Sequence, residues 1–196
     1  MTRKSLAALV ALGALLVAGC GSSASSADSP TAPGNPVDRA FAKEMTAHHQ
    51  SAVQMAKIAQ RRGKSAFVKR LADDIVRTQT KEIATMRTAD QRLRNAGVKK
   101  GSLGVPQHMM GMNGDMSKLK TAKPFDAAFM RMMITHHQGA IVMAKAELKK
   151  GKDPELKRLA QNIITAQQRE IRQMRTQLKS STGATSMPKA SMHGGH

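Results

Sequence analysis

The sequence predicts an all-α fold, a four-helix bundle made of two copies of a helical hairpin. Apolar residues recur at three- and four-residue steps through four long segments, which is the period of a helix with one buried face. The sequence shows no extended alternation of apolar and polar residues, the pattern typical of strands. The segment Met45–Ala56 also returns as Met133–Ala144, at an offset of 88 residues.

The first hairpin is predicted to comprise residues 37–97. Pro36 precedes a helix over residues 37–62, and Gly63 suits its end. Ser65 can cap a second helix over residues 66–95, which Gly97 closes.

The second hairpin, residues 124–179, has matching start and stop signals. Pro124 stands near the start of a helix that runs to Lys150, and Gly151 ends it. Asp153 and Pro154 then have the order expected for the N-cap and first position of a helix that ends near Lys179. The two hairpins are joined by a linker, residues 98–123.

Methionine and histidine gather in the linker and in the tail, residues 180–196. A loop as long as this linker inside a compact domain is usually functional or disordered. The tail is predicted to be disordered and has the same composition. The linker carries His108, Met109, Met110, Met112 and Met116.

The N-terminus is predicted to be an export signal, residues 1–19, with Arg3 and Lys4 before a short apolar run. Val-Ala-Gly-Cys20 resembles the lipobox of bacterial lipoproteins, which implies cleavage before Cys20 and lipidation of its thiol. An ordinary signal peptide or an uncleaved anchor is the alternative. Residues 20–36 are small and polar and are expected to form a flexible stalk. The predicted location is the outer face of a bacterial membrane.

The net charge of +19 could suggest a nucleic-acid partner. Export argues against this, and the chain has no Tyr or Trp to stack on bases. Lysine and arginine are also spread along the helices rather than clustered. We therefore expect no nucleic-acid binding, and at most an unspecific attraction to anionic lipids or envelope polymers.

The repeated segment is predicted to place a polar band across the middle of the bundle. In a hairpin that turns near Lys64, His48 is level with the stretch between Gln79 and Glu82. In the second hairpin, His136 is level with the equivalent stretch, Gln167 to Glu170. The bands of the two hairpins are level if both turns lie at one end, and offset by about 9 Å if the turns lie at opposite ends.

Two interpretations of this band stay open. It can be a buried hydrogen-bond network that fixes the packing register, with methionine as an adaptable core residue. It can also be a metal site, with imidazole and thioether ligands supported by glutamate and glutamine.

The distribution of soft donors favours metal binding. All seven histidines lie in methionine-containing segments, and six of the fourteen methionines after Met1 lie in the linker and tail. Thioether sulfur favours Cu(I), imidazole also accepts Cu(II), and zinc would more often require cysteine. The predicted metal is copper, with Cu(I) favoured and Cu(II) or Ag(I) as alternatives. The candidate ligands are Met45, His48, His49, Met55, Glu82, Met86, His108, Met109, Met110, Met112, Met116, Met133, His136, His137, Met143, Glu170 and Met174, with Gln79 and Gln167 in support.

The doubled motif resembles a known family. His-His-Gln-x-Ala-x-x-Met-Ala occurs at 48–56 and 136–144, and Gln-x-x-Glu-Ile-x-x-Met follows at 79–86 and 167–174. These segments resemble the domain of unknown function 305 family over about residues 37–178. The resemblance implies a ferritin-like four-helix bundle. Some members are periplasmic copper-binding proteins linked to copper tolerance, so it also implies copper binding outside the cytoplasm.

The predicted function is that of a non-catalytic, copper-binding lipoprotein that sequesters Cu(I) or exchanges it with a donor or acceptor protein. No catalytic triad, Cys/His pair or phosphate-binding glycine loop is visible in the sequence. A scaffold bundle whose polar band is purely structural is the alternative. A di-iron oxidase is less favoured, because such sites use Glu-x-x-His. No glutamate of the chain has a histidine three residues later.

Overall fold

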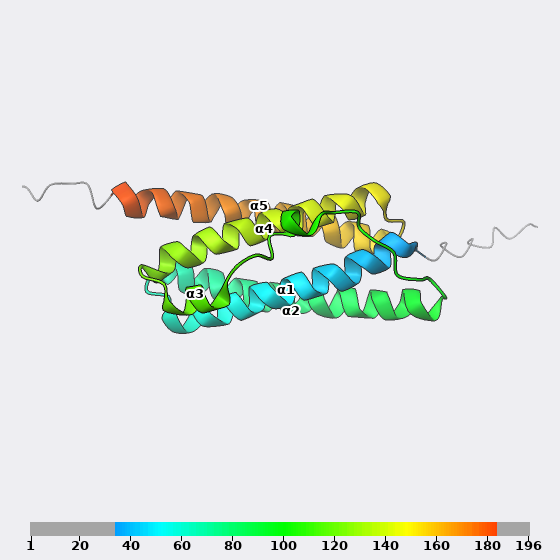
Figure 1. Ribbon diagram of the computed structural model, residues 1–196, viewed down its shortest axis with the longest axis horizontal. Coiled ribbons are helices and arrows are strands. Elements are labelled where there is room, and N and C mark those ends of the chain that lie inside the picture. The colour runs from blue at the N-terminus through cyan, green and yellow to red at the C-terminus, as the bar shows by residue number, and fades with distance from the viewer. Residues whose placement is uncertain (1–33, 184–196) are drawn as a thin grey trace, which may run out of the picture. The chain divides into compact units, whose positions relative to one another are not determined.

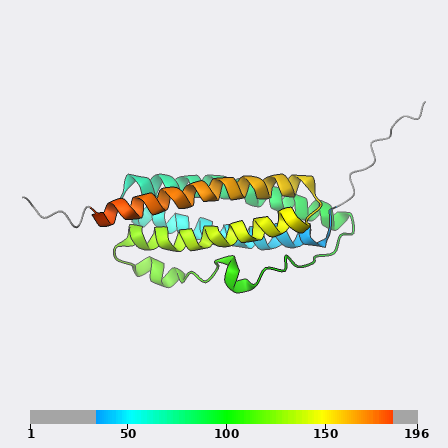
Figure 2. The same cartoon turned by 90° about the horizontal axis from the view of Figure 1, so that it is seen from above.

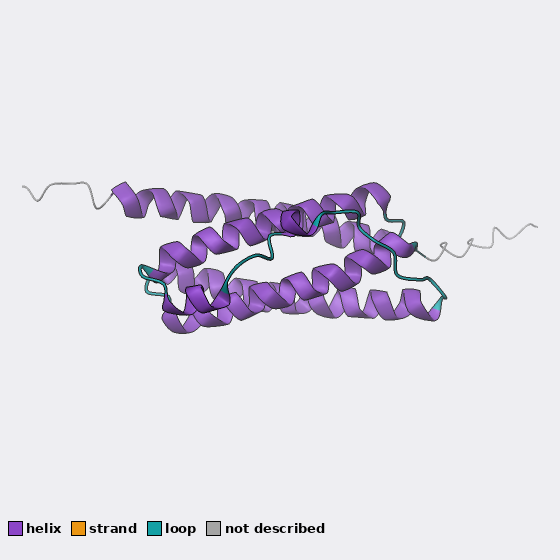
Figure 3. Cartoon of the chain, viewed as in Figure 1, coloured by secondary structure: helices purple, strands orange, loops and turns teal. Residues whose placement is uncertain are grey.

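The computed structural model describes residues 34–183, which form a four-helix bundle with a linker along its side (Figures 1 and 2). These residues are helical or in loops, and no strand occurs among them (Figure 3). The predicted all-α bundle is therefore confirmed. The helices are α1 (Pro36–Arg62), α2 (Ala66–Asn95), α4 (Phe125–Lys150) and α5 (Pro154–Gly183), with the short η1 (Gln107–Met110) and α3 (Met116–Thr121) in the linker.

The helices begin where side chains can accept their first backbone N–H groups. Ser65 accepts from Val68 at 3.2 Å at the start of α2. Asp153 accepts from the amides of Glu155 and Leu156 at 3.0 Å at the start of α5. Both predicted N-caps are confirmed.

Three of the predicted segments are wrong in detail. The stalk ends earlier than residue 36, because Asn35 caps α1 by accepting from the amides of Val37 and Asp38. The tail begins later than residue 180, because α5 continues to Gly183 and the Ser180 hydroxyl bonds back to the helix. The linker is not structureless, because it contains η1 and α3.

The other N- and C-terminal predictions fall on residues 1–33 and 184–196, outside the described residues. They include the export signal and the lipidation of Cys20. Within residues 34–183, no helix has the length and hydropathy needed to cross a membrane.

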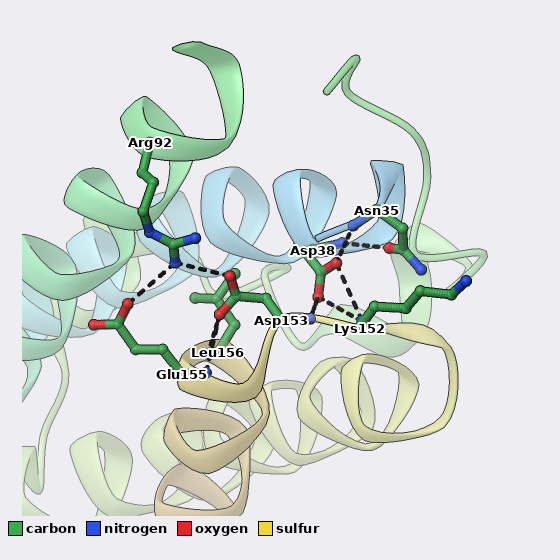
Figure 4. Close-up of polar contacts among 7 residues, drawn as sticks. All are labelled: Asn35, Asp38, Arg92, Lys152, Asp153, Glu155 and Leu156. Atoms are coloured by element: carbon green, nitrogen blue, oxygen red, sulfur yellow. Dashed lines mark hydrogen bonds and ion pairs between the residues drawn. The ribbon is translucent and has the colours of Figure 1, made fainter. Parts of the chain in front are cut away.

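Two equivalent aspartates set the arrangement of the hairpins. Asp38, at the start of α1, accepts from the amides of Lys152 and Asp153 in the α4–α5 turn at 2.9 Å (Figure 4). Its repeat counterpart Asp126, at the start of α4, accepts from the amides of Lys64 and Ser65 at 2.9 and 2.8 Å. The hairpins therefore exchange equivalent contacts, and their turns lie at opposite ends of the bundle (Figure 1).

A second carboxyl group is buried beside Asp38. Glu147 is fully buried and lies against Asp38, to which its protonated carboxyl group can donate a hydrogen bond. Burial and the neighbouring Asp38 raise the pKa of Glu147 from 4.5 to about 9. The equivalent residue of the first hairpin is Ala59, so this group breaks the repeat.

Glu147 predicts a fall in stability with rising pH. Because its pKa is higher in the folded protein than in the unfolded chain, the folded state holds an extra proton between pH 4.5 and about 9. The free energy of unfolding therefore decreases through this window, by at most about 1.4 kcal/mol per pH unit. Urea unfolding of a Glu147→Gln variant should show most of this slope removed. Glu155→Gln, a change at a half-exposed residue, should keep the slope, and an unchanged slope in Glu147→Gln would refute the assignment.

Candidate metal centre

The centre of the bundle contains two imidazole rings in direct contact. His48 on α1 and His136 on α4 are 1 % and 2 % exposed. Their ring centroids are 3.7 Å apart and their planes are inclined by 40°. The offset of about 9 Å predicted for turns at opposite ends is wrong, because the aspartate contacts align the start of each helix with the end of the other. The centres of α1 and α4, where these histidines lie, therefore coincide.

The neighbouring histidines bind the glutamates on the adjacent helices. His49 donates its Nε2–H to Glu82 on α2 at 2.8 Å, and His137 donates to Glu170 on α5 at 2.7 Å. Both histidine side chains are fully buried. The prediction that each histidine pair faces a glutamate of its own hairpin is confirmed. Each carboxylate fixes the tautomer of its imidazole and leaves Nδ1 with a lone pair.

The four imidazoles have unsatisfied nitrogen atoms. His48 donates its Nε2–H to the carbonyl of Met110 at 2.8 Å. The Nδ1 atoms of His48, His49, His136 and His137, and Nε2 of His136, have no hydrogen-bond partner among the described residues. A buried polar atom without a partner destabilises a protein by about 1–3 kcal/mol. Five such atoms in one band call for a functional explanation.

The central histidines are electrically neutral. Burial lowers the pKa of His48 from 6.5 to about 3, and burial also lowers the pKa of His136 well below 6.5. Neutral imidazole is the form that binds metal ions. His48 and His136 are therefore in the protonation state that can bind a metal ion.

The glutamines do not complete a hydrogen-bond network. Gln79 and Gln167 are each 3 % exposed, as predicted for residues of the band. The Oε1 atom of each has no hydrogen-bond partner in the part of the chain that the structure describes. If the band were only a hydrogen-bond network, these amides should complete it. That interpretation therefore does not explain the two buried Oε1 atoms.

The six candidate methionines of the four long helices form two equivalent sets. All are at most 1 % exposed. Each set belongs to a different core cluster, and each combines two methionines of one hairpin with one from the other. The sets are related by the 88-residue offset, so the core has two similar thioether groups. One set is Met45, Met86 and Met143, and the other is Met133, Met174 and Met55.

The linker places its candidate ligands in different surroundings. His108, Met109 and Met112 are exposed. Met110 packs against the first core cluster, and Met116 packs against the second. The linker methionines therefore do not converge on one point, and their roles as ligands stay predictions.

The linker packs closely against α4, a contact that the sequence pattern does not predict. We call residues 107–116 the strap. A Cβ at Gly139 of α4 would lie 1.9 Å from the Met110 carbonyl oxygen, so only glycine lets the strap lie so close. Gly111 has a φ of 68°, and a Cβ there would lie 2.4 Å from the Thr135 carbonyl oxygen. The available signal was a break in the repeat, because Ser51 stands at the position equivalent to Gly139.

The described residues contain no group of three or more His, Cys, Asp or Glu side chains placed to hold a metal ion. What residues 34–183 do contain is a bundle of two equivalent hairpins, with paired imidazoles between two methionine groups. These features define a class of helical proteins with a histidine- and methionine-rich core.

The chain belongs to the domain of unknown function 305 (DUF305) family, because residues 18–89 and 38–178 match it. The bundle is similar to solved structures of CopM. It is 34 % identical to the Cu(I)-bound form, covering 73 % of this chain and 96 % of that one, with a TM-score of 0.62. For the Cu(II)-bound form the identity is 35 %, the coverage is 73 % and 96 %, and the TM-score is 0.64.

Two further relatives are a bacterial and a viral protein. A predicted secreted DUF305 protein of Streptomyces coelicolor is 32 % identical, with 74 % of this chain and 93 % of that one covered and a TM-score of 0.63. An uncharacterised protein of Acanthamoeba polyphaga mimivirus is 45 % identical over 49 residues, which are 25 % of this chain and 32 % of the viral protein. This match spans about a third of the viral relative.

Proposed function

We propose that this protein binds copper, as Cu(I) in preference to Cu(II) and with Ag(I) as a surrogate, and that it holds or transfers the ion without catalysing a reaction. The observation that carries the proposal is the set of four buried Nδ1 atoms that have no hydrogen-bond partner within residues 34–183. They lie in a core that contains two groups of three thioethers. The similarity to CopM, which was solved with Cu(I), Cu(II) and silver bound, supports the proposal.

The donor chemistry suits a soft, monovalent ion. Imidazole nitrogen and thioether sulfur are neutral ligands, and sulfur selects Cu(I). Neutral ligands add no negative charge to the core, so a monovalent ion is easier to bury there than a divalent one. Glu82 and Glu170 lie behind His49 and His137, where they hold the rings in the tautomer that offers Nδ1.

We also propose that the protein acts outside the cytoplasm, anchored to the outer face of a bacterial membrane by lipid on Cys20. The supporting features are the charged and apolar N-terminal run and the cysteine that follows it. The secreted relative in Streptomyces coelicolor agrees with export. In an oxidising compartment a thiol is easily lost to oxidation, and a site of histidine and methionine avoids that loss. The ion would then be stored or exchanged with a donor or acceptor protein of the envelope.

A metal titration tests the proposed function. The mature chain, with Cys20 replaced by serine to remove its thiol, is titrated with Cu(I), Ag(I), Cu(II) and Zn(II) under matched conditions. Cu(I) is offered in competition with a chromogenic chelator under reducing conditions. The proposal expects Cu(I) and Ag(I) to be retained against the chelator and Zn(II) to bind much more weakly. Absence of Cu(I) uptake under these conditions would refute it.

The linker methionines are expected to add binding capacity. Replacing Met109, Met110, Met112 and Met116 with leucine should lower the Cu(I) stoichiometry, because leucine preserves size but lacks sulfur. Helicity measured by circular dichroism should not change, since none of the four lies in a long helix. Met130→Leu, a change at a buried methionine outside the candidate set, serves as the control. Unchanged stoichiometry would show that the linker methionines are not ligands.

A further inference from the structure

A groove between the strap and α4 leads toward the central imidazoles. Its volume is about 460 Å³. Four side chains with soft-metal donor atoms line it: His108 of the strap, Met132 and His136 of α4, and Met55 of α1. The polypeptide thus brings two imidazoles and two thioethers from three segments to one opening.

The donors of this groove differ in their access to solvent. His108 is exposed and Met132 is partly exposed. Met132 lies directly under the strap, since a Cβ at Gly114 would be 3.1 Å from its sulfur. Met55 and His136 are 1 % and 2 % exposed, and neither ring nitrogen of His136 has a hydrogen-bond partner in the described part of the chain. The groove therefore joins solvent-facing donors to a buried imidazole with open coordination capacity.

The first hairpin differs at the position of the outer thioether. At the position equivalent to Met132 it has Glu44, and this carboxylate is paired with Lys100 at 3.0 Å. The histidine and methionine core follows the repeat, whereas Met132 of the groove does not. An asymmetric feature of this kind suits a route of entry better than a storage position, because one route serves both halves of the core.

The charges at the rim disfavour divalent cations more than monovalent ones. Arg131, Lys118 and Asp115 line the groove, and Asp115 is paired with Lys118 at 3.8 Å. The net charge of these three groups is positive, which opposes a divalent cation more strongly than a monovalent one. The four donor side chains named above are neutral thioethers and imidazoles.

We propose that this groove is the entry port for a soft monovalent cation, with His108 and Met132 as the outer donors and Met55 and His136 as the inner ones. This inference rests on the proposed function and adds to it Met132, which the sequence did not single out. The ion exchanges one neutral donor for the next, and no electron or proton is transferred. The outer donors control how fast the ion arrives, while the buried band controls how tightly it is held.

The test separates the rate of uptake from the affinity. Stopped-flow transfer of Cu(I) from a chelator is followed in the mature chain carrying both His108→Asn and Met132→Leu. The rate constant for uptake should fall about tenfold, the effect of raising the barrier by about 1.4 kcal/mol. The equilibrium affinity of the tightest site should stay within about twofold, because the band is intact. Met130→Leu, a methionine change on the same helix outside the groove, should match the unaltered protein.

Other results of this experiment would overturn the port alone or the port together with the proposed function. An unchanged rate in the double variant overturns the port but leaves the proposed function standing. An equal loss of rate in Met130→Leu overturns the port as well, because the effect would then arise from packing. Failure of the unaltered chain to take up Cu(I) at equilibrium overturns the proposed function and the port together.

Discussion

Replacing Gly139 with alanine is expected to release the strap from α4 while the four long helices remain folded. The new Cβ would lie 1.9 Å from the Met110 carbonyl oxygen and 2.1 Å from its carbon. Both are backbone atoms, so the strap itself must move. Alanine is favoured over glycine in a helix by about 1 kcal/mol, so α4 itself gains stability.

Release of the strap has a consequence at the metal centre. His48 loses the carbonyl of Met110 that accepts its Nε2–H at 2.8 Å. The groove opens at the same time, because Gly111 and Gly114 of the strap form part of its lining. The ring of His136, which lines this groove, should then become reachable by solvent.

Hydrogen exchange measures the effect of Gly139→Ala directly. Amides of residues 107–116 should lose protection, while those of the long helices should keep it. Ser51→Ala, at the equivalent position of the first hairpin, is the matched control and should leave the strap protected. Unchanged protection of the strap in Gly139→Ala would show that its docking does not depend on this contact.

Replacing His48 and His136 together with alanine is expected to abolish tight copper binding. The change removes the two imidazoles that are in contact at the centre of the core. Losing a supporting residue alone typically weakens metal affinity by about 10- to 100-fold, so losing two ligands should weaken it by more than about 100-fold. Two buried side chains are also removed, which should destabilise the bundle by about 2–5 kcal/mol.

This double variant distinguishes the two interpretations of the band. If the histidines only fix packing, stability falls while the copper stoichiometry and affinity stay the same. If they are ligands, both properties change. Phe129→Leu is the control, because it also alters a fully buried side chain but removes no metal-binding atom. It should lower the unfolding midpoint and leave Cu(I) affinity unchanged in the chelator competition.

The parts of the fold that local sequence determines could be predicted. Helix starts depend on a few adjacent residues, so Ser65 and Asp153 could be identified as caps without knowledge of the rest. The contacts of His49 and His137 with glutamate follow from the distance of each residue from its own turn. Both the caps and the histidine–glutamate contacts depend on residues of a single hairpin.

Features that depend on contacts between hairpins could not be predicted in the same way. The alignment of α1 with α4 is set by Asp38 and Asp126 binding backbone amides of the opposite turn, and these amides carry no sequence signal. The path of the strap is set by a backbone carbonyl against Gly139. Both Gly139 and Glu147 mark places where the two halves of the repeat differ. In a duplicated chain, positions where the two repeats differ therefore indicate features that occur in one half only.

X-ray absorption at the copper edge, recorded on the Cu(I)-loaded mature chain, tests the central claim most directly. The claim is that imidazole and thioether groups of the bundle core bind the ion together. We expect both nitrogen and sulfur neighbours around copper, and we expect the imidazole contribution to disappear in the His48→Ala and His136→Ala double variant. A spectrum with no sulfur neighbour, or one that the double variant leaves unchanged, would contradict the account.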